Sequence, residues 1–134
     1  MNQSALKLYR TIGVQGGVMD ASPHQLISML LSGALDRVAS AKGAIVRGEA
    51  ARRGELLGSA IAIIDSLRAS LEHNHGGEVS QNLASLYDYM EQHLVKANLA
   101  SDVTLLDEVS AILMQIRAGW ESIPAEERQQ QRPQ

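Results

Sequence analysis

Apolar residues recur every three or four positions through four segments of this chain, and residues that start or stop helices bound each segment. This spacing places the apolar side chains of a segment on one face of an α-helix. No run of β-branched and aromatic residues, which is typical of strands, interrupts the pattern. The sequence therefore predicts an all-α fold.

The first helix is predicted to begin sharply at Pro23. Ser22 is a good N-cap, and Pro23 has the fixed φ that suits the first helical position. Gln25 stands where a capping box needs its return hydrogen bond, and Gly48 is predicted to end the helix. The inner face of this helix comprises Leu26, Ile27, Leu30, Leu31, Ala34, Leu35, Val38, Ala41 and Ile45.

The other three helices follow the same pattern. The second is predicted over Ala50 to His73, and the third begins after Gly76 and Gly77, which supply the positive φ of a tight reversal. The third helix is predicted to break at Asn98 to Ser101, and Asp102 caps a fourth helix that Pro124 closes. The inner face of the second helix comprises Leu56, Leu57, Ala60, Ile61, Ile63, Ile64, Leu67 and Leu71. The apolar residues that indicate the third helix are Val79, Leu83, Leu86, Tyr87, Met90, Leu94 and Ala97, and the apolar stripe of the fourth comprises Leu106, Val109, Ile112, Leu113, Ile116 and Trp120.

Four helices of comparable length with short connections predict an antiparallel up-down four-helix bundle over residues 23–124. Residues 1–22 contain several glycines and are predicted to form a flexible N-terminal leader, or cap segment. Residues 125–134 have no apolar residue larger than alanine and are predicted to be a disordered polar tail. The length of 134 residues suits one such domain.

Composition excludes several classes of function. A formal net charge of -3 gives no electrostatic reason to bind nucleic acid. The chain has no cysteine, so it has no disulfide, thiol nucleophile or thiolate metal site. No segment approaches the ~20 apolar residues of a membrane span, and the first residues lack the apolar core of a signal peptide. A cytosolic protein without direct membrane insertion is expected.

The reactive residues do not form a recognisable catalytic pattern. A di-iron bundle needs two Glu-x-x-His motifs, and the only match, Glu72 to His75, lies at a predicted helix end. His73 and His75 have no third metal ligand nearby, and His24 and His93 are expected to be exposed surface residues. Neither a nucleophile elbow nor a phosphate-binding loop is present. We expect no catalytic, cofactor or metal site.

The first two helices carry more apolar surface than a surface helix needs. At 100° per residue, the apolar arc of the second helix from Ile63 to Ile61 spans roughly 160°. A central position in the bundle would explain this width, and an apolar groove open to a partner is the alternative. The candidate groove residues are Leu31, Leu35, Leu57, Ile61 and Ile64.

The N-terminal leader, residues 1–22, could lie across such a groove and cover its apolar side chains. It is rich in apolar residues, but its glycines make it too short and broken for a fifth bundle helix. A sharp helix start at Pro23 would let the segment before it attach and detach independently. The candidate cover residues include Leu6, Tyr9, Ile12 and Val14.

Several motifs then follow one another in order. They are Tyr9 and Val14, VMDASPHQLISML at 18–30, AIAIIDSL at 60–67, GGEVSQNLASLYDYM at 76–90, KANLASD at 96–102, and Trp120. The motif S-P-x-x-L alone is little more than a helix start, whereas its combination with N-L-x-x-L-Y-D-Y-M and the downstream A-N is specific. From Tyr9 to Trp120 the chain resembles the FliS family of flagellin-specific export chaperones.

The resemblance implies a cytosolic bundle that binds the disordered C-terminal segment of flagellin and prevents subunits from polymerising before export. It also implies delivery of flagellin to a transient membrane-protein partner, the flagellar type III export gate, without a cofactor. By matching position, Leu6, Tyr9 and Val14 belong to an N-terminal motif tied to client and gate contacts. The chain departs from the family pattern in its looser leader, with Gly16 and Gly17, and in having no phenylalanine.

Individual polar and aromatic residues leave alternatives open. Tyr87 is expected inside the bundle, whereas Tyr89 lies some 200° away on the same helix and faces a groove or solvent. Asn82 is either a surface amide or a hydrogen-bond partner of the client backbone. Trp120 is expected to fasten the last helix to the bundle. The alternative function is a self-associating structural bundle without a client, which would form a homodimer.

Overall fold

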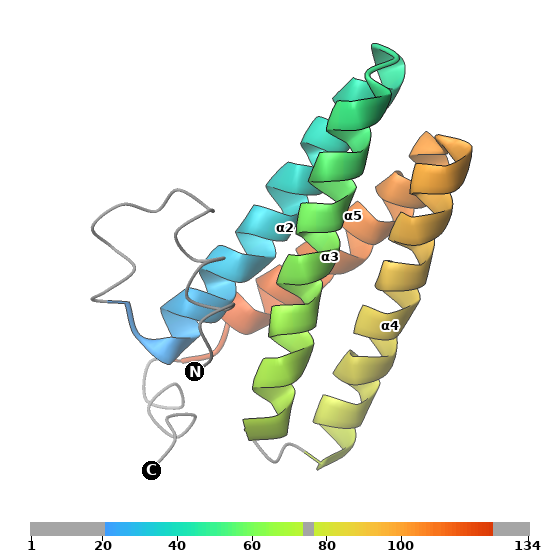
Figure 1. Ribbon diagram of the computed structural model, residues 1–134. Coiled ribbons are helices and arrows are strands. Elements are labelled where there is room, and N and C mark those ends of the chain that lie inside the picture. The colour runs from blue at the N-terminus through green and yellow to red at the C-terminus, as the bar shows by residue number, and fades with distance from the viewer. Residues whose placement is uncertain (1–20, 74–76, 125–134) are drawn as a thin grey trace.

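A computed structural model describes residues 21–73 and 77–124 of the chain, and these residues form helices and no strand. Figure 1 shows the helices running alternately up and down. The predicted all-α, antiparallel four-helix bundle is therefore confirmed, whereas the predicted polar tail and residues 1–20 of the predicted leader lie outside the described residues. The helices are α2 (Pro23–Val46), α3 (Ala50–His73), α4 (Gly77–Ala100) and α5 (Val103–Glu121).

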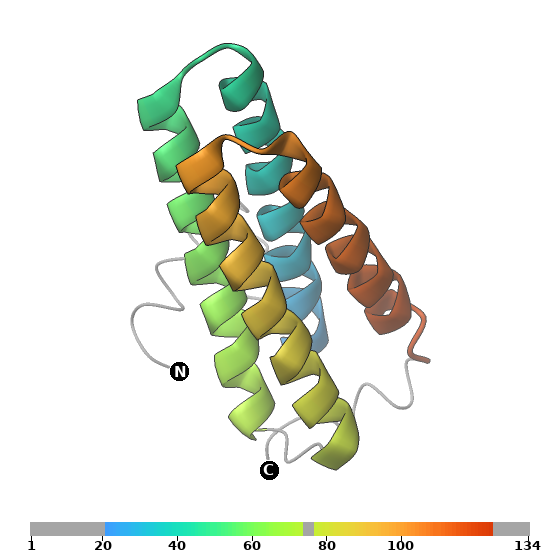
Figure 2. The ribbon, with the colours of Figure 1, turned by 90° about the vertical axis from the view of Figure 1, so that its right-hand side faces the viewer.

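The four helices form a closed ring. Each packs against its neighbours in sequence, and α5 packs back against α2. Figure 2 shows α4 and α5 meeting at the turn that joins them and then diverging, with α2 visible between their far ends. α4 and α5 are therefore closest near the turn that joins them.

Hydrogen bonds from nearby side chains cap the starts of α2 and α5, as predicted. The backbone N–H of Gln25 donates to Ser22 Oγ at 3.2 Å, and the Ser22 N–H donates to Gln25 Oε1 at 2.8 Å. These two bonds form the predicted capping box, with Pro23 at the first position of α2. The Asp102 carboxylate accepts from the backbone N–H of Thr104 at 2.9 Å and caps α5.

The predicted break at Asn98 to Ser101 is wrong for its first three residues, because α4 continues through Ala100. An asparagine side chain can end a helix by hydrogen-bonding nearby backbone groups. Here the Asn98 Oδ1 accepts instead from Arg53 Nε of α3 at 2.9 Å. The chain turns at Ser101, which has a φ of 52° and whose Oγ lies 2.7 Å from Arg53 Nη1. Arg53 of α3 therefore bonds the side chains of Asn98 and Ser101, and α4 continues to Ala100.

The interior is built from aliphatic side chains, as expected of a chain without phenylalanine. Among the described residues, Tyr87 is the one tyrosine or tryptophan in the buried core, which confirms its predicted position inside the bundle. The buried apolar residues are Leu30, Leu31, Ala34, Val38, Ala41, Ala44, Leu56, Leu57, Ala60, Ile63, Ile64, Leu67, Tyr87, Met90, Leu94, Ala97, Leu106, Val109 and Leu113.

Burial of Tyr87 predicts a loss of stability at high pH. Desolvation raises the pKa of the Tyr87 phenol from 10.0 to about 12. Because the folded-state pKa is raised, the stabilising contribution is complete below the unfolded pKa and is lost as the pH rises through the folded pKa. At about pH 11, one unit above the unfolded value, the loss should be on the order of 1 kcal/mol.

Urea unfolding at several pH values measures this effect. The wild-type chain should lose more stability between pH 9 and about pH 11 than Tyr87→Phe, which has no phenol to ionise at this position. Parallel curves for the two proteins would contradict the predicted role of Tyr87.

Candidate protein-binding surface

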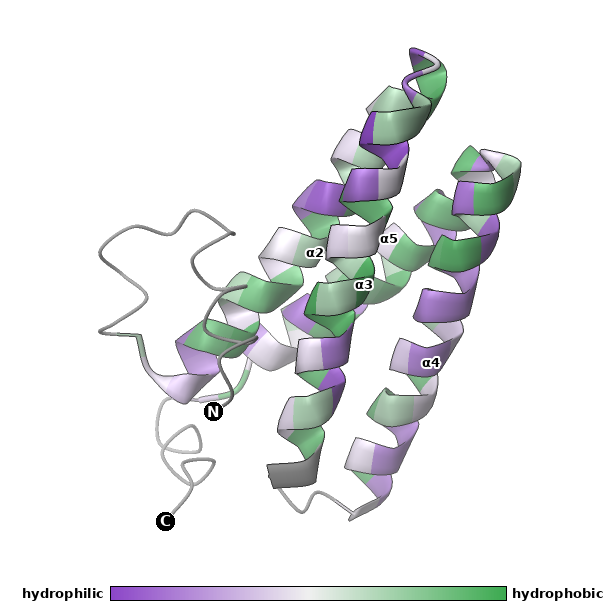
Figure 3. Ribbon diagram, in the orientation of Figure 1, coloured by the Kyte–Doolittle hydropathy of each residue, from purple (hydrophilic) through white to green (hydrophobic). Residues whose placement is uncertain are grey.

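Exposed apolar side chains gather on one helix. Of the seven exposed large apolar residues among those described, five belong to α4. Figure 3 shows apolar and polar residues mixed along this helix. The five are Val79, Leu86, Tyr89, Val95 and Leu99, and the other two are Val46 of α2 and Met114 of α5.

Four exposed residues of α4 lie on one face. Val79, Asn82, Leu86 and Tyr89 are separated by three, four and three positions, which is the spacing of neighbours on a helix surface. The apolar members are 69% (Val79), 38% (Leu86) and 41% (Tyr89) exposed. We call these four residues the α4 stripe. Because Tyr89 contacts Glu108 of α5, the stripe borders α5.

The residues predicted to line a groove on the first two helices are placed differently. Leu31, Leu57 and Ile64 are fully buried, and Leu35 and Ile61 are partly buried against the core. The wide apolar faces of α2 and α3 are explained by their places in the bundle, because each helix packs against two others. α2 packs against α3 and α5, and α3 packs against α2 and α4. The exposed apolar surface lies on α4 instead, and a role for these five residues in client binding stays a prediction.

Asn82 and Tyr89 are the predicted site residues that the structure brings together on an exposed surface. Val79 and Leu86, two of the apolar residues from which the third helix was predicted, share their face and are exposed. The predicted cover residues Leu6, Tyr9, Ile12 and Val14 lie outside the described residues.

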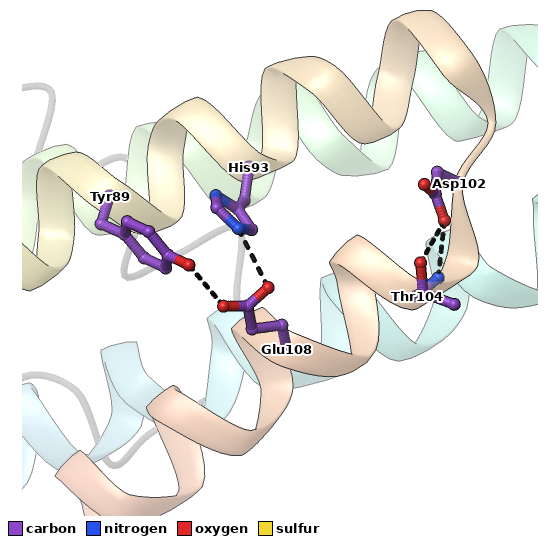
Figure 4. Close-up of polar contacts among 5 residues, drawn as sticks. All are labelled: Tyr89, His93, Asp102, Thr104 and Glu108. Atoms are coloured by element: carbon purple, nitrogen blue, oxygen red, sulfur yellow. Dashed lines mark hydrogen bonds and ion pairs between the residues drawn. The ribbon is translucent and has the colours of Figure 1, made fainter.

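A carboxylate joins α4 to α5 next to the α4 stripe (Figure 4). The Tyr89 hydroxyl donates to Glu108 Oε1 at 2.5 Å, and His93 Nε2 lies 3.0 Å from Glu108 Oε2. The rings of Tyr89 and His93 are 4.1 Å apart. His93 was expected to be exposed, but its side chain is only 12% exposed, with the Tyr89 ring beside it and Glu108 within hydrogen-bond distance.

These contacts change how readily two of the groups ionise. The hydrogen bond from Tyr89 is the largest cause of the lowered pKa of Glu108, and the charge and hydrogen bond of His93 act in the same direction. The same bond to Glu108 raises the pKa of the Tyr89 phenol. The arrangement therefore favours an ionised carboxylate that accepts from a neutral phenol.

His24 was also expected on the surface and is instead buried, with 6% of its area exposed. Its Nε2 donates to the carbonyl oxygen of Trp120 at 2.9 Å, and Trp120 Nε1 donates to the His24 carbonyl oxygen at 2.9 Å. The two rings stack with centroids 4.8 Å apart. The start of α2 meets the end of α5 in this antiparallel bundle, so a first-turn residue becomes interior. Trp120 fastens α5 as predicted.

Metal-ligating side chains do not gather in the described part of the bundle. Over residues 21–71 and 77–124, whose side chains the structure describes, no three histidine or acidic side chains are grouped so that they could hold a metal ion. The Glu72 to His75 motif lies outside the described side chains. Among the helices that the structure describes, none has the length and apolar character of a membrane span.

An all-α bundle with exposed apolar side chains concentrated on one helix belongs to the class of helical protein-binding modules. The family model described as "Flagellar protein FliS" matches residues 5–127. The chain therefore belongs to the FliS family, which confirms the resemblance seen in its motifs.

Curated relatives match most of the chain. It is 45% identical over 119 residues to the flagellar secretion chaperone FliSB of Pseudomonas aeruginosa, covering 89% of this chain and 94% of the relative. It is 42% identical over 121 residues to the flagellar secretion chaperone FliS of Salmonella typhimurium, covering 90% of each. The FliS of Bacillus subtilis is 34% identical over 114 residues, or 85% of this chain and 84% of the relative.

Proposed function

We propose that this chain is a cytosolic flagellar export chaperone. It binds the disordered C-terminal segment of flagellin, prevents premature polymerisation and aids delivery to the flagellar type III export gate. Relatives named flagellar secretion chaperones support this proposal. The structural observation that carries it is the set of exposed apolar side chains on α4.

The α4 stripe is the contact surface that we assign to the client. A disordered segment loses about 1 to 2 kcal/mol of backbone entropy per ordered residue, so a large contiguous apolar contact is needed to offset the loss. A client helix that lays its apolar face along the stripe would supply this contact. Asn82, in the middle of the stripe, is available to hydrogen-bond the client backbone.

The leader is proposed to cover part of the client surface when flagellin is absent. Leu6, Tyr9, Ile12 and Val14 supply its apolar contacts. Displacing a cover that is already bound lowers the net affinity for the client. Release at the export gate is thereby made easier, and the chaperone needs no cofactor or catalytic residue for it.

Placing a charge in the α4 stripe tests the proposal. Leu86→Lys should weaken binding of a flagellin C-terminal peptide at least about tenfold, because the variant loses the burial of a leucine and would bury an unpaired ammonium. The matched control is Val95→Lys, which changes a half-exposed residue of α4 outside the stripe and should bind as the wild type does. Titration calorimetry measures the affinities, and circular dichroism checks the fold.

Two outcomes would contradict the assignment of the stripe. In one, Leu86→Lys binds with wild-type affinity. In the other, Val95→Lys weakens binding as much as Leu86→Lys, so that the effect is not specific to the stripe. The alternative function, a self-associating structural bundle, predicts that the isolated chain elutes as a homodimer and does not bind the peptide.

A further inference from the structure

The stripe ends in an aromatic ring whose position is fixed from another helix. Tyr89 is the exposed aromatic residue of α4, and its hydroxyl reaches across to Glu108 Oε1 of α5 at 2.5 Å. His93 lies one turn further along α4, with its ring 4.1 Å from that of Tyr89 and tilted by 38°. Its Nε2 lies 3.0 Å from the second oxygen of the same carboxylate. Each Glu108 oxygen thus has one donor from α4, as Figure 4 shows.

We propose that Tyr89 is the aromatic anchor of the client surface, and that Glu108 and His93 are positioning residues that hold its ring for an apolar helix face of the client. This inference rests on the proposed function. It adds the residues that prepare the surface before the client arrives.

The geometry favours a ring that is ordered in advance. The hydroxyl already has an acceptor in Glu108, so a client that packs on the exposed ring does not have to supply one. Tyrosine offers a large contact area with few rotatable bonds, and aromatic residues of this kind often dominate binding energy. Fixing a side chain before binding avoids its entropy cost at the moment of association.

The position of His93 supports a holding role over a direct contact. Its side chain is largely buried, and its Nδ1 is buried without a hydrogen-bond partner among the described residues. A client therefore meets Tyr89 rather than His93. The His93 ring limits the rotation of the Tyr89 side chain on one side, and the Glu108 carboxylate holds the hydroxyl end.

Flagellin-peptide binding by full-length variants tests the inference. Tyr89→Ala should weaken binding by at least about tenfold, because the anchor is lost. Tyr89→Phe and Glu108→Ala should each weaken it about three- to tenfold, because the ring remains but is no longer held. The double variant Tyr89→Phe/Glu108→Ala should be no weaker than either single variant, since both changes break the same bond.

Two further variants separate positioning from general stability. Glu108→Gln keeps an acceptor oxygen for the Tyr89 hydroxyl and should restore binding to within about twofold of wild type. Asp107→Ala is the matched control: it removes the neighbouring carboxylate of α5, which pairs with Lys42 of α2 and does not touch the stripe. Its affinity should equal that of the wild type.

A measurement without client tests the holding contact itself. In a background that carries Tyr9→Phe and Tyr87→Phe, so that Tyr89 is the one tyrosine left, ultraviolet titration should show the pKa of Tyr89 falling toward its ordinary value when Glu108 is replaced by alanine. No fall, or a wild-type affinity of Glu108→Ala for the peptide, would overturn the positioning role. If the wild-type chain itself fails to bind the peptide, the proposed function and this inference both fail. If the wild type binds and Tyr89→Ala binds equally well, only this inference fails.

Discussion

Trp120→Ala is expected to lower the free energy of unfolding by about 3 kcal/mol, near the lower end of the values for a truncated core tryptophan because the ring is partly exposed. The variant loses the stack on His24 and the hydrogen bond that the indole N–H makes, whereas the bond from His24 Nε2 to the backbone carbonyl oxygen of residue 120 can still form. The hydrogen-bond donor from the Trp120 indole to the His24 carbonyl oxygen disappears, and the ring that covers the buried histidine is gone. The link between the start of α2 and the end of α5 is thereby broken.

Urea or thermal unfolding followed by circular dichroism measures this loss. For a domain of this size, the midpoint of thermal unfolding should fall by about 10 °C. Met114→Ala on the same helix truncates an exposed side chain and should change stability by less than about 0.5 kcal/mol. Equal stabilities for the two variants would show that the end of α5 is not fastened by Trp120.

Arg68→Ala is expected to cost about 3 kcal/mol through unpaired acidic groups. The Arg68 guanidinium of α3 lies 3.3 Å from Asp65 and 3.2 Å from Asp88 of α4, and it also contacts Glu91 of α4. The Glu91 side chain is largely buried. Without the arginine, three carboxylates face one another between α3 and α4, and one of them is a poorly solvated charge.

A surface pair on the same helix provides the control. Arg52 lies 3.7 Å from Glu55 one turn along α3, and both side chains are mostly exposed. Arg52→Ala should therefore change the free energy of unfolding by less than about 0.5 kcal/mol. The double variant Arg68→Met/Glu91→Leu should recover most of the stability lost in Arg68→Ala, because it removes the arginine and its buried partner together. An equal, small cost for Arg68→Ala and Arg52→Ala would contradict the role of the acidic cluster.

The helix starts could be predicted from the sequence because their chemistry is local. The Ser22 cap depends on a residue three positions away, and the Asp102 cap on one two positions away. The end of α4 could not be placed to the residue, because Arg53 on another helix holds Asn98 and Ser101. A long-range contact of this kind leaves no signal in the local pattern.

The exposure of the candidate surface residues could not be predicted for a related reason. The periodic pattern groups apolar residues on a helix face, but it does not tell which part of that face a neighbouring helix covers. Ile64 is buried because α3 packs between α2 and α4, whereas Leu86 lies at the edge of the buried face of α4 and stays exposed. Glu108 had no motif to mark it, since its partners Tyr89 and His93 come from another helix.

Calorimetric titration of the wild-type chain with the C-terminal segment of flagellin, repeated at several temperatures, tests the central claim most directly. We predict saturable binding at micromolar concentration or tighter, with a negative heat-capacity change from apolar burial and a gain of helicity on mixing. An absence of binding heat at all temperatures, with circular dichroism equal to the sum of the separate components, would contradict the proposal that an unstructured client folds onto the exposed apolar residues of α4.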